Sequence, residues 1–125
     1  MKRLYALRGA VCCENTEEDM RLRIAGMYDE LVGLNNLEEE EIVSAIFSAT
    51  VDLTAANPCT ALREAVCGKT NRAATVPLFS AQEPQSDNSL EKTVRVIIHC
   101  YLEEGVKTHH VYRNGAQVLR KDRVL

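Results

Sequence analysis

The sequence has no long apolar run. Its most apolar stretch, Val94 to Leu102, is interrupted by Arg95 and His99 and is far shorter than the roughly 20 apolar residues that a membrane span needs. The basic start reaches Arg8 without an apolar segment in between, which is not the pattern of a secretion signal. We therefore expect a cytoplasmic protein that does not bind membranes.

An excess of positive charge and regularly spaced metal ligands are missing as well. Fifteen Lys and Arg stand against eighteen Asp and Glu, a net charge of -3, which argues against nucleic acid as a partner because phosphate binding needs a clustered cationic surface. The five cysteines are odd in number and show no CxxC spacing, so a disulfide framework and a metal site are both disfavoured. We expect reduced thiols, most of them small core residues, and no bound metal.

What the chain does have is the composition of one globular domain. It contains 125 residues, 46% of them hydrophobic and 26% charged, with no repeats or low-complexity segments. This length is enough for one hydrophobic core but too short for two. We expect a single domain over residues 1–119 and a mobile C-terminal tail over residues 120–125, since chain ends are usually poorly ordered.

Residue patterns predict an alternation of strands and helices. Met20, Ile24, Met27, Leu31 and Leu34 recur at the three- and four-residue spacing of an amphipathic helix. The predicted strands run from Lys2 to Cys12, Glu41 to Ala49, Ala74 to Phe79 and Thr93 to Leu102, with two short ones around Val111–Tyr112 and Gln117–Leu119. The first predicted helix runs from about Thr16 to near Asn35–Asn36. The second begins at Pro58, a residue suited to the first helical position, and ends at about Cys67, where Gly68 stops it.

This order predicts an α+β fold, a mixed β-sheet with its helices on one face. Such a sheet leaves its second face uncovered. In a chain this short, we expect oligomerisation to cover that face.

Two arginines occupy unusual places in the predicted strands. Arg8 ends a strand face that also carries Leu4 and Ala6, and Arg95 stands between valines in the longest predicted strand. A guanidinium among apolar strand residues needs an anion to offset its desolvation. Glu83 is the candidate internal partner, and one positive charge is then left over, which would suit an anionic ligand that also carries a hydroxyl group. The alternative is that both arginines form internal ion pairs only.

Several segments carry a family resemblance, in order and over nearly the whole chain. They are Arg8-Gly9-Ala10, Thr16-Glu17-Glu18, Ser48 through Leu53, Pro58 through Glu64, Val76-Pro77 with Gln82-Glu83, Arg95-Val96, His110-Val111-Tyr112 and Val118-Leu119-Arg120. In these segments the chain resembles the monofunctional trimeric chorismate mutases. The resemblance implies a homotrimer whose sheets pack into a pseudo α/β barrel, with active sites between subunits. It also implies the rearrangement of chorismate to prephenate in phenylalanine and tyrosine biosynthesis, with no cofactor.

Roles follow from the resemblance by matching position. Arg8 and Tyr112 would hold the carboxylate of the enolpyruvyl side chain, and Arg95 would reach the ether oxygen. Glu83 would accept the ring hydroxyl's hydrogen bond, while Arg63 and Arg120 would lie near the mouth of the site. The catalytic residues implied are Arg8, Glu83 and Arg95. The substrate-binding residues implied are Arg8, Asn57, Thr60, Arg63, Phe79, Ser80, Ala81, Gln82, Glu83, Arg95, Tyr112 and Arg120.

The sequence departs from the family pattern at four of these positions. Asn57 and Thr60 replace an aromatic residue and a lysine, Phe79 replaces a small polar residue, and Ser80 replaces a cysteine. The loss of a cation at Thr60 weakens substrate steering from that helix. Ser80 can still donate and accept a hydrogen bond.

Two other classes of function compete with this interpretation. One is a trimeric small-molecule-binding or enamine-deaminase protein of similar subunit fold, which leaves Glu83, the second arginine and Tyr112 unexplained as a group. The other is a non-enzymatic interaction module, in which Arg8 and Arg95 form structural ion pairs. Formation of prephenate from chorismate separates all three.

Overall fold

A computed structural model describes residues 1–66, 68 and 71–123, with side chains up to Leu119. Its strands are β1 (Lys2–Cys12), β2 (Ile42–Ala49), β3 (Leu78–Gln82), β4 (Thr93–Glu103) and β5 (Val111–Arg113). Its helices are α1 (Glu17–Leu34), α2 (Pro58–Glu64) and two 3-10 helices, η1 (Glu39–Glu41) and η2 (Ala116–Arg123).

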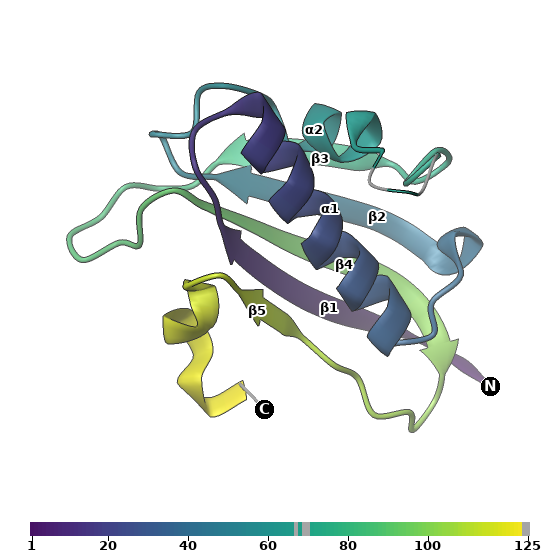
Figure 1. Cartoon of the computed structure of the whole chain (residues 1–125). Helices are drawn as coiled ribbons and strands as arrows, with labels where there is room; N and C mark the ends of the chain where they lie inside the picture. The colour runs from purple at the N-terminus through teal and green to yellow at the C-terminus, as the bar shows by residue number, and fades with distance from the viewer. Residues whose placement is uncertain (67, 69–70, 124–125) are drawn as a thin grey trace.

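The five strands form one mixed sheet in the order β3-β2-β4-β1-β5. The long strands β1 and β4 pair antiparallel along their whole length near the centre, and β2 pairs antiparallel with the other side of β4. The two edge strands are parallel to their neighbours, β3 to β2 and β5 to β1. Both α-helices lie on one face, with α1 crossing the sheet and packed against α2 (Figure 1). The predicted α+β class and the one-sided helical cover are confirmed.

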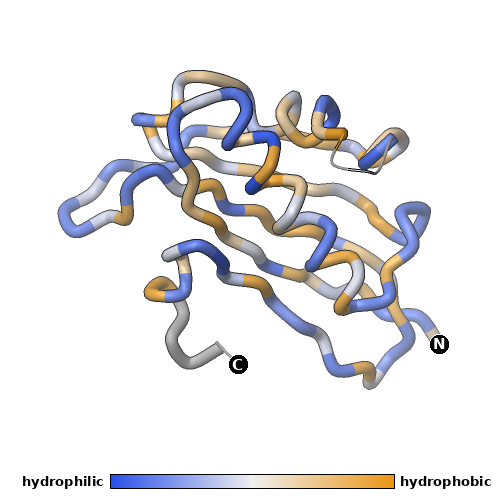
Figure 2. The backbone as a smooth tube through the Cα atoms, in the orientation of Figure 1, coloured by the Kyte–Doolittle hydropathy of each residue, from blue (hydrophilic) through white to orange (hydrophobic). Residues whose placement is uncertain are grey.

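The alternation of residues along the strands separates a covered face from an open one. On β1, Leu7 and Val11 lie in the core beneath α1, while Leu4, Ala6 and Arg8 on the other face are exposed. On β4, the even-numbered residues from Val94 to Leu102 are buried, and the odd-numbered ones are half-buried or exposed. Apolar segments follow the strands, and polar segments dominate the loops at both ends of the sheet (Figure 2). One face of the sheet therefore makes the core, and the other carries Arg8 and Arg95.

Both helices begin with a side-chain cap. Thr16 Oγ1 accepts a hydrogen bond from the Asp19 N–H at 3.1 Å, and Asn57 Oδ1 accepts one from the Cys59 N–H at 2.9 Å. Each cap satisfies an N–H group that has no partner within its helix. These starts agree with the predicted ones.

A buried ion pair holds the segment after α2 against α1. Arg72 is 2% exposed, and its guanidinium donates to both carboxylate oxygens of Asp29 at 2.8 Å and to the Ala65 carbonyl at 2.7 Å. Such bidentate geometry offsets the desolvation of a buried charge. The sequence analysis did not single out this pair, because nothing in the spacing of Asp29 and Arg72 indicates contact.

The structure corrects the end of α2 and the position of β3. α2 ends at Glu64 because Ala65 is already extended, so the helix predicted to reach about Cys67 is shorter, and Cys67 itself lies outside the described residues. The strand predicted over Ala74 to Phe79 is instead β3, at Leu78–Gln82. Pro77 has no N–H for a ladder, but its carbonyl accepts from the Ala45 N–H at 3.0 Å, and the parallel pairing begins there.

The strand predicted around Gln117–Leu119 is wrong, since these residues lie in η2. Asn114 and Gly115 have φ angles of 52° and 103°, and this left-handed turn reverses the chain after β5. Gln117 Oε1 then accepts the Gly115 N–H at 2.7 Å. The backbone of residues 120–123 continues η2, Val124 and Leu125 lie outside the described residues, and the mobility of the tail stays a prediction.

Candidate active site

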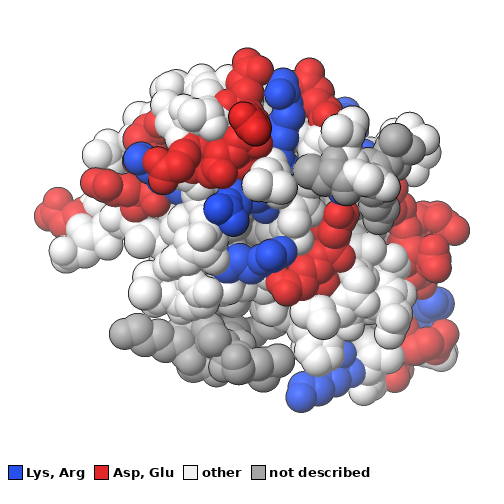
Figure 3. Space-filling model, in the orientation of Figure 1, with Lys and Arg blue, Asp and Glu red and all other residues white. Residues whose placement is uncertain are grey.

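The open face of the sheet contains a cavity of about 440 Å³ where β1, β2 and β4 approach β5 and η2. Its lining includes Arg8 from β1, Arg95 from β4 and Tyr112 from β5, together with Ser48 and Leu119. On the helix-bearing face, acidic and basic side chains interleave (Figure 3). The two arginines singled out in the sequence thus lie in one cavity.

Strand register explains why these side chains converge. Ala10 on β1 lies opposite Arg95 on β4 in the antiparallel ladder and beside Tyr112 on β5 in the parallel one. The Arg8 N–H donates to His110 Nδ1 at 3.0 Å, which ties the approach to β5 to the end of β1. Tyr112 is thereby held on the same part of the sheet as both arginines.

Neither arginine is buried within the single chain, contrary to the expectation from their apolar strand neighbours. Arg8 is exposed, and the Arg95 side chain keeps 42% of its surface accessible. The reason is that both lie on the face away from α1 and α2. Their apolar sequence neighbours pack into the core on the opposite face.

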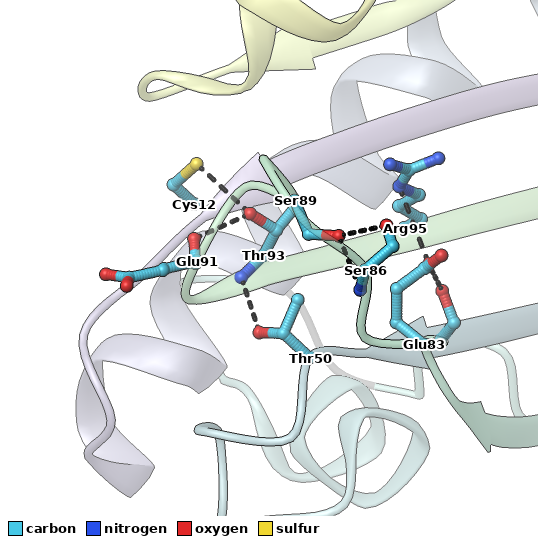
Figure 4. A network of polar contacts seen from close by, with 9 residues as sticks. Cys12, Thr50, Glu83, Ser86, Ser89, Glu91, Thr93 and Arg95 are labelled. Carbon is cyan, nitrogen blue, oxygen red and sulfur yellow. Dashed lines mark hydrogen bonds and ion pairs between the residues drawn. The ribbon is translucent and has the colours of Figure 1, made fainter.

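Glu83 is brought to Arg95, as the sequence suggested. Arg95 Nε lies 3.5 Å from Glu83 Oε1, and the two side chains point toward one another (Figure 4). The Glu83 N–H donates to the Ala49 carbonyl at 2.8 Å, which fixes the residue just after β3. The same Oε1 accepts a hydrogen bond from Ser48 Oγ at 2.6 Å. Glu83 lines an adjacent polar cavity of about 250 Å³ rather than the first one, so its carboxylate lies at the boundary between the two.

Two buried donors in the first cavity have no hydrogen-bond acceptor among the described residues. They are the atoms Arg95 Nε and Tyr112 Oη. Arg95 Nε is itself buried although the rest of the side chain is accessible, and its 3.5 Å ion pair with Glu83 is not a hydrogen bond. Leaving a buried polar group without a partner is unfavourable by about 1–3 kcal/mol. The cavity is therefore suited to a ligand that brings oxygen acceptors and negative charge.

Of the remaining predicted residues whose side chains the structure describes, Ala81 alone lines the first cavity. The Arg63 guanidinium donates to the Val76 carbonyl at 3.1 Å, and Asn57 Nδ2 donates to Ser80 Oγ at 2.9 Å. Thr60 on α2 and Phe79 and Gln82 on β3 are exposed. The Arg120 side chain lies outside the description. One chain thus gathers Arg8, Glu83, Arg95 and Tyr112 but leaves the α2 residues near the β3 edge of the sheet.

Ser48 was not predicted from the sequence as a contact of Glu83. Ser48 belongs to a segment that carries the family resemblance, but a single serine in a strand gives no sign of its partner. His110 belongs to another of these segments. No indication in the sequence predicted that its ring would accept the Arg8 N–H.

Within the described ranges, no three His, Cys, Asp or Glu side chains come together as a metal-binding group. None of the helices in those ranges combines the length and apolar character required to cross a membrane.

Comparisons with known proteins identify the family. Residues 4–123 match the family model described as chorismate mutase type I. Chorismate mutase AroH of Bacillus subtilis (strain 168) is 30% identical over 121 residues, covering 95% of this chain and 91% of that protein. Chorismate mutase AroH of Thermus thermophilus is 30% identical over 119 residues, covering 93% of each.

A solved structure agrees with this assignment. The chorismate mutase from Clostridium thermocellum matches with a TM-score of 0.80 and 35% sequence identity, covering 91% of this chain and 98% of that one. The chain belongs to the chorismate mutase type I family. It is therefore an isomerase, and the predicted family and enzyme class are confirmed. The enamine-deaminase and interaction-module alternatives are set aside.

Proposed function

We propose that the chain binds chorismate in the cavity that holds Arg8, Arg95 and Tyr112, and rearranges it to prephenate. The observation that carries this proposal is the pair of donors without acceptors, Arg95 Nε and Tyr112 Oη, in one cavity with the exposed Arg8. Chorismate is a dianion with two carboxylates, an ether bridge and a ring hydroxyl. It supplies both the negative charge and the acceptor oxygens that these groups lack.

The reaction is unimolecular: the ether C–O bond breaks while a new C–C bond forms within the same molecule. No nucleophile or base is needed, so the protein acts by holding a compact conformer and by placing fixed charges. Arg8 and Tyr112 bind the carboxylate of the enolpyruvyl group. Arg95 donates to the ether oxygen, where negative charge grows in the transition state. The Glu83 carboxylate accepts a hydrogen bond from the ring hydroxyl and offsets positive charge that develops on the ring.

A homotrimer with sites between neighbouring subunits fits the open face of the sheet. Leu4, Ile46, Phe79 and Tyr101 are large apolar residues exposed there, on strands whose register places them on the face opposite the helices. Exposed apolar surface of this kind is typical of an interface between subunits. Packing of the open sheet faces would give the interior of a pseudo α/β barrel.

A neighbouring subunit also explains where the other site residues act. Asn57, Thr60 and Arg63 lie on or at the start of α2, near the β3 edge, whereas Arg8 and Tyr112 lie toward the β5 edge. We assign the residues of α2 and of β3, from Phe79 through Gln82, to the mouth of the site, where one subunit meets the next. Arg120 follows Leu119, which lines the cavity, and we assign it to the opposite side of the mouth.

We further propose that the enzyme acts in the cytoplasm, on the basis of its thiols and its reaction. The four described cysteines are all free, which agrees with a reducing cytoplasm. Prephenate feeds phenylalanine and tyrosine biosynthesis. We place the enzyme in that pathway.

Incubation of the purified protein with chorismate, followed by NMR, tests the reaction: prephenate is expected, and its absence at high enzyme concentration would overturn the proposal.

Light scattering tests the assembly, with an expected mass three times the 14.0 kDa of one chain. A matched pair of variants locates the interface. Leu4→Asp on the open face should dissociate the assembly, and Leu22→Asp on α1, with 50% exposure against 49%, should not. A monomeric wild-type protein contradicts the trimer.

A further inference from the structure

Ser48 is placed at the centre of the candidate site by the sheet itself. On β2 it lies opposite Arg95 of β4 and beside Ala81 of β3. β2 has neighbours on both sides, so the backbone at Ser48 is held by two ladders. Its side chain is half-buried and lines the cavity with Arg95.

The hydroxyl of Ser48 makes the one side-chain hydrogen bond to Glu83 found among the described residues. Ser48 Oγ donates to Glu83 Oε1 at 2.6 Å, whereas Arg95 Nε lies 3.5 Å from the same oxygen and makes no hydrogen bond. A bond between an O–H and a carboxylate at this distance is of the strong, charge-assisted kind. Glu83 Oε2 has no hydrogen-bond donor within the described part of the chain and is left for a ligand.

We infer that Ser48 is a positioning residue of the reaction, which fixes the Glu83 carboxylate so that Oε2 meets the ring hydroxyl of the substrate. This inference rests on the proposed role of Glu83. The terminal torsion of a glutamate is broad, so the carboxylate rotates freely unless one oxygen is held. Arg95 Nε makes no hydrogen bond to this carboxylate, and in the proposed reaction its guanidinium is directed at the ether oxygen. Ser48 is independent of the substrate and holds Glu83 before and during the reaction.

Ser48→Ala tests the inference by removing the hydroxyl alone. We expect kcat to fall by about tenfold to a hundredfold, the range for losing one hydrogen bond to a charged group, while KM changes by less than about threefold. Ser48→Thr keeps the hydroxyl and should recover most of kcat. Ser44→Ala is the matched control: Ser44 lies on the same strand, and its hydroxyl is 3.3 Å from His99 Nδ1, outside the cavity. It should leave kcat unchanged.

A double-mutant cycle separates positioning from a structural effect. If Ser48 acts through Glu83, then Ser48→Ala lowers kcat no further once Glu83→Gln is present. Equal losses in both backgrounds overturn the inference, as does a Ser48→Ala enzyme with normal kcat beside an impaired Glu83→Gln enzyme. A Glu83→Gln enzyme with normal kcat instead overturns the proposed role of Glu83. If Ser48→Ala fails to fold, Ser48→Cys replaces it, with a similar shape and a weak donor; normal kcat in that variant also overturns the inference.

Discussion

Arg95→Ala separates a catalytic arginine from a structural one, because the two interpretations predict opposite outcomes. In the part of the chain that the structure describes, the Arg95 guanidinium makes one ion pair, 3.5 Å from Glu83, with 42% of the side chain accessible. Ion pairs of this exposure contribute roughly 0–1 kcal/mol to stability. For 125 residues, with an unfolding entropy of about 2.1 cal/mol/K per residue, the loss corresponds to a fall in Tm of no more than about 4 °C.

The expected effect on catalysis is much larger. Arg95 Nε is a buried donor without an acceptor in the described chain, and in the proposed reaction it meets charge that appears mainly in the transition state. Removal of one such preorganised donor costs about 3–4 kcal/mol, a fall of roughly 10²- to 10³-fold in kcat. Arg95→Lys keeps the charge but loses the planar donor fork, and we expect an intermediate kcat.

The assay combines initial rates of prephenate formation, thermal unfolding and light scattering on the same samples. Arg3→Ala is the control, since Arg3 is an exposed arginine of β1 that stacks on Tyr5, 4.7 Å from the ring centre. It should retain normal kcat. Near-normal kcat for Arg95→Ala refutes the assignment of Arg95, and loss of folding with no measurable assembly supports the structural ion pair instead.

Two further predictions concern the C-terminal segment and the thiols. Truncation after Leu119 removes Arg120, Lys121 and Arg123; it should raise KM more than it lowers kcat, and the effect should shrink at high salt, because exposed charges are screened beyond about 8–10 Å. Unchanged kcat/KM at both salt concentrations contradicts this. Burial raises the thiol pKa of Cys13 to about 12 and of Cys100 to about 11, so both thiols should stay protonated at pH 8 and resist alkylation in the folded enzyme. Rapid labelling of either thiol, mapped by mass spectrometry, would contradict this prediction and show that the core around that cysteine opens.

The two central strands could be predicted from their long runs of strand-forming residues. β1 spans the predicted Lys2 to Cys12, and β4 exceeds its predicted end by one residue. Both strands are eleven residues long, so each run is long enough to fix its position. β3 has only five residues at an edge, so its pattern is too short to fix its position, and the Pro77 carbonyl extends the pairing without any side-chain signal.

The family resemblance names Arg8, Arg95 and Tyr112, but their convergence in one cavity depends on strand register. Arg8, Arg95 and Tyr112 meet because Ala10 pairs with Arg95 on one side and Tyr112 on the other. No local pattern encodes that pairing. The hydroxyl of Ser48 reaches Glu83 across 35 positions of sequence for the same reason.

Two of the departures from the family pattern are linked by a hydrogen bond in this chain. Asn57, which replaces an aromatic residue, caps α2 through Oδ1 and donates through Nδ2 to Ser80, which replaces a cysteine. The two replacements are therefore partners, since an aromatic ring at position 57 could make neither bond. The Asn57 bond joins the start of α2 to β3 at the proposed mouth of the site. The cation missing at Thr60 is not restored by this pair, so in the proposed site the capture of a dianion at the mouth would depend on Arg63 and the C-terminal segment. This dependence is the reason that truncation after Leu119 should affect KM in particular.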